Sequence, residues 1–495
     1  MRRALRAERW SLGLHWLVAG LAAGIVVAVY VVYSSNVRGP GFPLDDAWIH
    51  QTYARNLAHG LGWVYQRGQP SGGSTSPLWT ILLAAGQFFR FSPVLWVSVL
   101  GVAALAAAAV GASAWIVSGL GQPTQFARWA GLALLLEWHL VWAALSGMET
   151  LLAALLPLVY FWMTSDSKGG PIILGLVVGL GIWIRPDLLS LSVAAAWLWW
   201  FSARQWGRTV RWLLLFGAGL AIAALPYLLL QAALAGRPWP STLYAKQAEY
   251  AVLRQAPLAT RYFGQLAAPF VGGLLLLTPG IALWAVDVFR RRAWLELAPI
   301  VWVLTYVGAF AVRLPVSYQH GRYSMPVIPV LFVLGIVGFR RAIRAMQQQS
   351  WAWVLSRAWS ASLVLVTVVF LGIGARAYAQ DVAIIQTEMV RTADWLRENT
   401  GANALIAAHD IGAIGYFADR RILDLAGLVS PGVIPILRDE TALAVVIEKQ
   451  DADYLVTFPS WYPSLVQGRA AVYSTDAPFA PVLGAENMTV YRWGD

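Results

Sequence analysis

The sequence predicts a mostly α-helical, multi-pass membrane protein with about eleven transmembrane helices and a small α/β domain at its C-terminal end. Of its 495 residues, 58% are hydrophobic and only 12% are charged, whereas soluble domains carry about 25% charged residues. Long apolar runs fill the first three quarters of the chain. Amphipathic and alternating patterns replace these runs after about residue 380. Most of the chain is therefore expected to lie in lipid.

The N-terminal segment predicts a retained membrane anchor. Its apolar run from Leu12 to Tyr33 is too long for a signal-peptide core and lacks a small-residue cleavage site. The chain has no cysteine, which excludes disulfides and thiolate metal sites. Its net charge of +11 does not indicate nucleic acid in a chain this apolar, because the inner loops of membrane proteins collect Lys and Arg.

The apolar runs define the expected spans. They lie at roughly 12–33, 93–118, 128–145, 149–164, 171–184, 188–203, 212–234, 263–289, 294–312, 323–339 and 353–376. A further run at 77–90 is too short to span, so we expect an interfacial or re-entrant helix there. The resulting domains are a transmembrane domain at 1–379, with a first outer loop at about 34–92, and a soluble domain at 380–495.

Charge distribution supports this topology. With the N-terminus inside, nearly every basic cluster falls on the inner side, as positive-inside bias requires. These residues are Arg2, Arg3, Arg6, Arg9, Arg128, Lys168, Arg204, Arg208, Arg211, Arg290, Arg291, Arg292, Arg340, Arg341, Arg344 and Arg357. Counting 77–90 as a span would scatter them. We therefore expect a plasma (inner) membrane protein with a cytoplasmic N-terminus and an extracytoplasmic C-terminal domain.

The first outer loop contains the most informative motif, the adjacent pair Asp45-Asp46. A carboxylate in this position can act as a general base that takes a proton from a hydroxyl while its neighbour shapes the site. The structural alternative is that Asp46 caps a helix that starts near Ala47. His50 lies about one helical turn after Asp46 and could face the same cavity. Tyr53 belongs to the expected interfacial helix that ends at Gly60.

Cationic side chains gather at the same predicted outer face. Arg, Lys or His there would stabilise charge that develops on a phosphate leaving group. The candidates are Arg185, Lys246, Arg313, His320 and Arg322, with Tyr323 beside Arg322. The alternative for each arginine is an interfacial side chain that reaches lipid headgroups. Further candidate cavity residues are Glu149, Asp187, His409 and Asp410.

Glu137 and His139 lie near the middle of the third expected span. Ionisable groups inside a membrane are functional candidates, but we favour a hydrogen-bonded pair internal to the helix bundle. No histidine spacing predicts a metal site. Asp45, Asp46 and Glu149 could hold a divalent ion, although nothing in their spacing requires one, so no cofactor is predicted.

The C-terminal region reads as a small α/β domain. Strands are expected at 404–410, 421–425, 454–458 and 488–493, and helices at 387–399 and in ETALAVVIEKQ. The run from Asp410 to Gly415 is neither a dinucleotide-binding motif nor a P-loop. It predicts a tight turn with close backbone packing.

Together these motifs resemble a known family. The string DDAWIHQTYARNLAHGLGWVYQRGQPSGGSTSPLW between two spans is similar to the first loop of GT-C glycosyltransferases, within them to the mycobacterial terminal β-(1→2) arabinofuranosyltransferases and their bacterial relatives. SGMET, RPDLL, HGRYSMPVIP and HDIGAIGYFADRRILDLAGL belong to the same pattern. The resemblance covers nearly the whole chain.

The resemblance implies an inverting, usually metal-independent glycosyltransferase of the plasma membrane. Asp45 would be the base, with Asp46 beside it, and a polyprenyl-phosphate sugar donor would enter laterally from the bilayer. The C-terminal domain would help to hold the acceptor, a cell-surface glycan or glycolipid.

Two other functions remain open from the sequence. A transporter or flippase of lipid-linked glycans would show inverted repeats and charged groups along a path through the bilayer, and we find no repeat. A non-catalytic scaffold would leave the polar motifs of the outer face unexplained.

Overall fold

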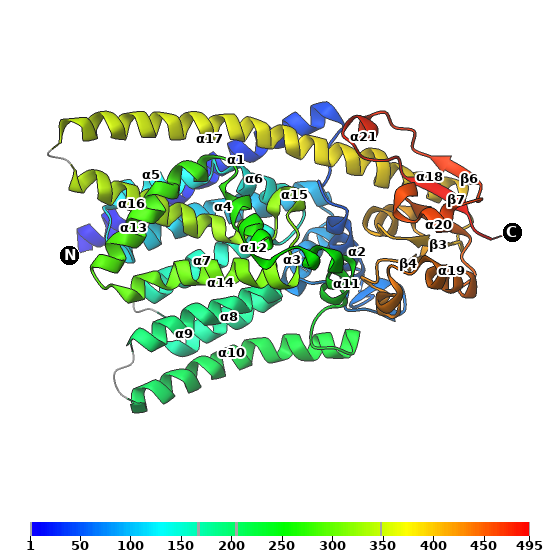
Figure 1. Ribbon diagram of the computed structural model, residues 1–495, viewed down its shortest axis with the longest axis horizontal. Coiled ribbons are helices and arrows are strands. Elements are labelled where there is room, and N and C mark those ends of the chain that lie inside the picture. The colour runs from blue at the N-terminus through cyan, green and yellow to red at the C-terminus, as the bar shows by residue number, and fades with distance from the viewer. Residues whose placement is uncertain (1, 166–168, 203–205, 347–348, 495) are drawn as a thin grey trace.

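The computed structural model describes residues 2–165, 169–202, 206–346 and 349–494. Lys168 and Arg204, which contributed to the predicted charge bias, and residue 495 of the C-terminal domain lie outside the described residues. A bundle of helices fills most of the length of the molecule, and a small α/β part stands at one end (Figure 1). The two chain ends lie at opposite ends of the long axis (Figure 1).

The bundle is built from twelve of the described helices. They are α1 (Arg2–Val37), α4 (Pro93–Ser118), α5 (Thr124–Leu134), α6 (Trp138–Leu145), α7 (Thr150–Ser165), α8 (Pro171–Ile184), α9 (Leu191–Ser202), α10 (Trp206–Ala235), α13 (Thr278–Arg290), α14 (Ala298–Arg313), α16 (Ile328–Ala345) and α17 (Ser350–Ile384). Small residues let several of these helices approach closely: an added Cβ on Gly280 or Gly338 would strike the facing backbone of the α13–α16 pair.

Seven helices of the described residues are long and apolar enough to cross a membrane, by length and composition. Three shorter apolar helices, Pro77–Phe88, Thr150–Ser165 and Pro171–Ile184, accompany them. The chain is thus a multi-pass membrane protein, and the number eleven stays a prediction. One expected span needs correction: 263–289 is not a single helix. A short helix, α12 (Leu258–Ala267), precedes it, and the long apolar helical segment begins at Gly273.

The expected span 128–145 is interrupted where Glu137 stands. Residues 135–137 separate α5 from α6, and the Glu137 carboxylate accepts a hydrogen bond from the Leu140 amide at 3.1 Å. It also pairs with His139 Nδ1 at 2.7 Å. Glu137 therefore caps α6 from inside the bundle, which confirms the internal hydrogen-bonded pair favoured from the sequence.

The first loop folds as α2 (Asp46–Ala58), a hairpin of β1 (Val64–Gln66) and β2 (Gln69–Pro70), and α3 (Pro77–Phe88). Pro77 begins α3, where the missing proline N–H has no helical partner to lose. Trp79 Nε1 donates to the Gly147 carbonyl at 2.8 Å, which joins α3 to the turn before α7. The loop is thus a packed layer at one end of the bundle.

The C-terminal part follows α17 without a break, through a π-helical turn (Ile385–Val390) into α18 (Arg391–Asn399). The predicted domain boundary at 379–380 lies within this continuous helix. A five-stranded sheet follows in the order β4-β3-β5-β7-β6, with β3 parallel to β4 and β5 and with β7 antiparallel to β5 and β6. Its strands are β3 (Leu405–Ala408), β4 (Arg421–Asp424), β5 (Tyr454–Thr457), β6 (Ala471–Ser474) and β7 (Thr489–Arg492), with α19 (Glu440–Lys449), α20 (Pro463–Val466) and α21 (Phe479–Val482) between them.

The four predicted strands and both predicted helices of this part are confirmed. The helix expected at 387–399 is the last stretch of the long helix that starts at Ser350. The edge strand β6 was not predicted, because Ala471 and Val472 are exposed and the segment has no buried alternate face.

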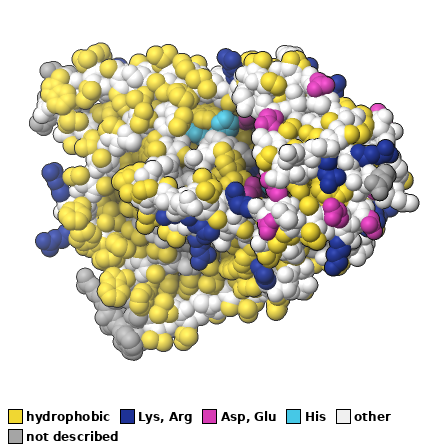
Figure 2. Space-filling model, turned by 45° about the vertical axis from the view of Figure 1, so that its right-hand side comes forward, with side chains coloured by type: hydrophobic (Ala, Val, Ile, Leu, Met, Phe, Trp, Pro, Cys, Tyr) yellow, Lys and Arg dark blue, Asp and Glu magenta, His cyan; other side chains and the backbone are white. Residues whose placement is uncertain are grey.

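The α/β part packs on the first loop. Arg55 of α2 donates to the Tyr416 and Gly415 carbonyls at 2.7 and 3.3 Å, and Gln66 exchanges two hydrogen bonds with the backbone of Ile422. Apolar side chains cover the helical part, whereas charged side chains gather over the α/β part and along the seam between the two (Figure 2). Asp45 and Asp46 lie in this seam.

Candidate active site

Asp45 connects the first loop to the α/β part. Its two carboxylate oxygens accept hydrogen bonds from the backbone amides of Gly412 and Ala413 at 2.6 and 2.8 Å. Gly412 is required at this point, since a Cβ there would overlap the Asp45 backbone. The close backbone packing predicted for 410–415 is confirmed, and Gly412 admits the carboxylate. The predicted tight turn is wrong, because residues 412–418 form a short helical segment whose first amides bind Asp45.

The helix-cap alternative for Asp46 is wrong. The helix α2 begins at Asp46 without any side-chain cap hydrogen bond. Instead, Asp46 Oδ2 accepts from Lys246 Nζ at 2.7 Å and from Arg322 Nη2 at 2.6 Å. Lys246 lies on α11 (Ser241–Glu249), and Arg322 follows the short α15 (Tyr318–Gly321). Segments far apart in the sequence therefore meet at this carboxylate.

The two neighbouring carboxyls have opposite proton affinities. Burial, together with the charge of Asp410, raises the pKa of Asp45 to about 8, and the two amide hydrogen bonds offset this only in part. Burial also acts to raise the pKa of Asp46, but Lys246 and Arg322 outweigh it and hold that pKa far below the usual range. Asp46 is thus a permanently ionised anchor for the two cations, and Asp45 is the better proton acceptor near neutral pH.

A first cavity, here the helix-side cavity, opens among the short 3-10 turn η1 (Pro186–Ser190), α11 and α14. It has a volume of about 470 Å³, and Glu149, Arg185, Asp187, Lys246, Tyr306, Arg322 and Tyr323 supply its polar lining. Arg185 is buried and pairs with Asp187 at 3.0 Å and, more loosely, with Glu149 at 3.8 Å. The structure therefore brings together four of the predicted phosphate-binding residues, Arg185, Lys246, Arg322 and Tyr323. The predicted cavity residues Glu149 and Asp187 line the same cavity.

A second cavity, here the seam cavity, has a volume of about 800 Å³ and lies between the first loop and the α/β part. Asp45, Asp46, Lys246, Arg322, His409 and Asp410 line it, together with Glu249, Tyr250, Trp461 and Tyr462. Lys246 and Arg322 line both cavities. The acidic pair Asp45-Asp46 therefore lines the same cavity as Lys246 and Arg322, two of the predicted phosphate-binding cations.

Arg322 carries unused hydrogen-bonding capacity. Its Nη2 donates to Asp46 and, at 3.1 Å, to the Tyr323 hydroxyl. Its Nε and Nη1 are buried and have no hydrogen-bond partner among the described residues. A buried guanidinium with two free donor nitrogens fits an oxyanion, because leaving such donors unpaired costs free energy.

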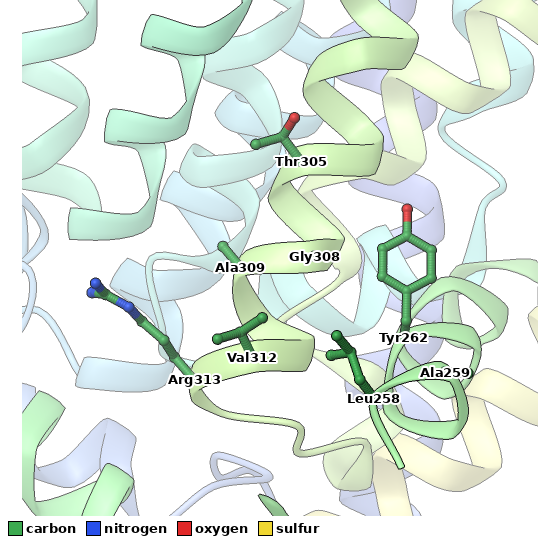
Figure 3. A pocket seen from close by; sticks show the side chains of 8 residues that line it. All are labelled: Leu258, Ala259, Tyr262, Thr305, Gly308, Ala309, Val312 and Arg313. Carbon is green, nitrogen blue, oxygen red and sulfur yellow. The ribbon is translucent and has the colours of Figure 1, made fainter.

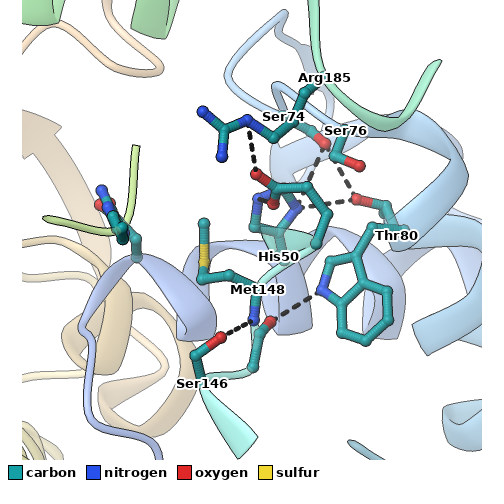
Figure 4. A network of polar contacts seen from close by, with 12 residues as sticks. His50, Ser74, Ser76, Thr80, Ser146, Met148 and Arg185 are labelled. Carbon is teal, nitrogen blue, oxygen red and sulfur yellow. Dashed lines mark hydrogen bonds and ion pairs between the residues drawn. The ribbon is translucent and has the colours of Figure 1, made fainter. Parts of the chain in front are cut away.

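His50 supports the helix-side cavity from behind. Its Nδ1 contacts the Thr80 hydroxyl at 3.1 Å, and its Nε2 lies 3.8 Å from Glu149. Ser74 completes a buried network in which these side chains point toward one another beside Arg185 (Figure 4). His50 thus lies beside Glu149 without a hydrogen bond to it and does not line either cavity.

Two predicted site residues lie elsewhere. Tyr53 is fully buried, and its hydroxyl contacts Ser71 at 2.6 Å within the core of the first loop. His320 lies apart from the two cavities and pairs with Asp381 of α17 at 2.8 Å. Among the described residues, no group of three or more His, Asp or Glu side chains is placed to hold a metal ion, so the structure does not join Asp45, Asp46 and Glu149 in one coordination sphere.

Several residues that line these cavities were not predicted from the sequence. Glu249 contacts His409 at 3.4 Å, and Tyr462 contacts the other ring nitrogen of His409 at 2.7 Å. Glu249 follows Lys246 by one helical turn, a spacing that could have identified it. Tyr306 lies within an apolar helix, where its hydroxyl bonds to Asp187 and the Tyr323 carbonyl, and its position offered no signal.

Comparison with known proteins bears mainly on the fold. Residues 376–491 match a sequence family described as a domain of unknown function (DUF8728). No curated protein matches the sequence.

Solved structures share the overall fold of the chain. The crystal structure of ArnT from Cupriavidus metallidurans bound to undecaprenyl phosphate is similar, with a TM-score of 0.59 and 14% identity, over 96% of this chain and 98% of that one. The Archaeoglobus fulgidus oligosaccharyltransferase AglB, in complex with an inhibitory peptide and a dolichol-phosphate, matches with a TM-score of 0.58 and 12% identity, over 91% of this chain and 70% of that one. The predicted mostly helical, multi-pass fold with a C-terminal α/β part is thus one that these solved structures share, and the number of spans stays a prediction.

Proposed function

We propose that the protein is an inverting glycosyltransferase that moves a sugar from a polyprenyl-phosphate donor to a hydroxyl of a cell-surface glycan or glycolipid. The reaction would take place at the outer face of the plasma membrane, with the α/β part extracytoplasmic. The observation that best supports this proposal is that Lys246 and Arg322 line both the helix-side cavity and the seam cavity. One ligand in each cavity would meet at these cations, beside Asp45.

The helix-side cavity suits the donor phosphate. Four cations line it, and Arg322 has two buried nitrogens, Nε and Nη1, without partners among the described residues. The structural neighbours were solved with undecaprenyl phosphate and with a dolichol-phosphate. A sugar phosphodiester gains charge as its bond to the anomeric carbon breaks, and fixed cations at that oxygen lower the barrier.

An apolar groove beside this cavity suits the polyprenyl chain. Leu258, Ala259 and Tyr262 of α12 face Thr305, Gly308, Ala309, Val312 and Arg313 of α14 across it (Figure 3). Ala309 and Arg313 line both the groove and the helix-side cavity. A lipid tail in the groove would therefore have its phosphate end at the cation cluster.

The seam cavity suits the acceptor. Asp45 would take the proton of the acceptor hydroxyl as its oxygen attacks the anomeric carbon, while the bond from that carbon to the phosphate oxygen breaks and polyprenyl phosphate leaves with the electron pair. Attack from the face opposite the phosphate inverts the anomeric centre. Asp46 holds Lys246 and Arg322, and His409 and Asp410 stand where a second sugar unit of the acceptor would lie.

The decisive experiment uses purified Asp45→Asn, Asp46→Asn and wild-type protein with radiolabelled polyprenyl-phosphate sugars, arabinofuranose first because of the first-loop resemblance. We expect Asp45→Asn to lower turnover by about 100-fold or more, with donor affinity retained. Asp46→Asn should weaken donor binding as well, because it frees the two cations from their anchor. Turnover of Asp45→Asn near wild type would exclude it as the base.

The same preparation distinguishes the two other functions. In liposomes, movement of labelled lipid-linked sugar across the bilayer without a transfer product would favour a transporter. Neither transfer nor movement with any donor of the panel would favour a scaffold.

A further inference from the structure

Three successive residues before Arg322 adopt a left-handed backbone conformation. The φ angles are 54° at Gln319, 57° at His320 and 67° at Gly321. Only glycine adopts this conformation without strain, so Gln319 and His320 are held there at a free-energy cost. Such strain persists only where surrounding contacts over-determine it.

His320 is the residue that holds this turn. Its Nε2 lies 2.8 Å from Asp381 Oδ2, and Trp142 Nε1 donates to the same oxygen at 2.9 Å. The imidazole stands edge-on to Trp138 and Trp142, with ring centroids 5.4 and 5.3 Å away. The turn is thereby attached to the long helix α17 and to α6.

This left-handed turn fixes the backbone of Arg322, which follows it directly. The Arg322 amide donates to the Gln319 carbonyl at 3.2 Å, and Ser324 is fixed by a 3.0 Å hydrogen bond to Gln265. The Arg322 side chain is buried, lines both cavities and keeps two donor nitrogens without partners among the described residues. A long side chain with free donors keeps a fixed direction only if its backbone is fixed.

We propose that His320, through its pair with Asp381, is a positioning residue that fixes Arg322 for the phosphate of the donor. His320 lines neither cavity and so does not touch the donor itself. This inference rests on the proposed function, since it takes the anion that binds Arg322 to be the phosphate of a polyprenyl phosphate.

The test measures binding of undecaprenyl phosphate to the full chain in nanodiscs. We expect His320→Ala and Asp381→Ala each to weaken binding by about tenfold, and the double variant to lose no more than either one. A positioning residue must act through Arg322, so His320→Ala should change affinity by less than about twofold in an Arg322→Ala background. A merely structural role would weaken binding in both backgrounds.

His320→Asn separates the pair from the strain, because Asn tolerates a left-handed conformation but its shorter side chain leaves Asp381 out of reach. It should stay folded, with a melting temperature near wild type, and bind as weakly as His320→Ala. His59→Ala, at an exposed histidine of the first loop, is the control and should bind like wild type.

Wild-type affinity in His320→Ala, or an equal loss in the Arg322→Ala background, would overturn the positioning role alone. If the wild-type chain does not bind undecaprenyl phosphate, the proposed function fails and this inference fails with it.

Discussion

The adjacent residues Asp45 and Asp46 have different partners because a helix begins between them. Asp45 points at the amides of Gly412 and Ala413, while Asp46 points at Lys246 and Arg322. Backbone dipoles hold the first carboxyl and full charges hold the second. Two neighbouring carboxyls with opposite pKa shifts are the arrangement that separates a base from an anchor.

The first residue-scale prediction concerns pH. The pKa of Asp45 is about 8, so a base at this position is mostly protonated at neutral pH and gains activity as pH rises. We expect kcat/KM to rise between about pH 6 and 8 and to level above that range. Asp410→Asn removes a charge that raises the pKa of Asp45 and should shift the rise to lower pH. A flat profile over this range would contradict the assignment.

The second residue-scale prediction concerns a substitution at Gly412. In Gly412→Ala the new methyl group overlaps Asp45, so the carboxylate must move. Because a displacement of about 1 Å at a reacting group can lower rates about 100-fold, we expect a loss of turnover of that order. The melting temperature should also fall, since the new methyl group overlaps the Asp45 backbone. Gly432→Ala, in the same part of the chain, meets no atom within 4 Å and is the matched control. Equal turnover in the two variants would show that Asp45 does not need its present position.

At the scale of elements, short helices that do not span build the site. Asp46 begins α2, Lys246 lies on α11, and Arg322 follows the four-residue α15. Each of these segments connects longer apolar helices, so the bundle fixes where the short ones meet. The site thus uses connecting segments, as sites on rigid scaffolds commonly do.

An element-scale prediction concerns the groove between α12 and α14. Gly308→Phe would fill the groove, since even a Cβ at Gly308 comes within 3.5 Å of Tyr262. Displacing two lipid methylenes at about 0.8 kcal/mol each should weaken undecaprenyl phosphate binding roughly tenfold in a direct binding assay. Gly372→Phe, exposed on α17 with no atom within 4 Å, is the control. Unchanged binding in Gly308→Phe would place the lipid elsewhere.

At the scale of the whole molecule, the site lies where the bundle meets the α/β part. The first loop packs on residues 411–422 through Arg55, Tyr65 and Gln66. Chain segments more than 300 residues apart are therefore needed for one cavity, since Asp45 and Gly412 are 367 positions apart. Loss of the α/β part would remove both amides that hold Asp45.

A whole-molecule prediction tests the orientation. Because the chain has no cysteine, single cysteines can be placed without a background signal. Glu448→Cys, exposed on the α/β part, should react with a membrane-impermeant thiol reagent in intact cells, whereas Arg290→Cys, at the end of α13, should react only after permeabilisation. The reverse pattern would overturn the extracytoplasmic assignment.

Local patterns of the sequence predicted most elements, because apolar length and alternation depend on near neighbours. The long apolar helices, four strands and the acidic pair were found in this way. The break at Glu137, the start of the apolar helix at Gly273 and the exposed strand β6 were not. In each of these cases, packing or pairing with distant segments decides the element.

The sequence by itself determined that this chain is a multi-pass membrane protein with polar motifs between its apolar segments, since burial in lipid demands apolar composition and leaves the remaining polar residues conspicuous. Only the tertiary structure decided the partners. In the folded chain Asp45 accepts hydrogen bonds from two backbone amides, and Asp46 binds two cations. Lys246 and Arg322 line two cavities, and His320 pairs with Asp381. Those assignments depend on the relative positions of helices from distant parts of the chain, and side-chain direction at such contacts is not encoded in local periodicity.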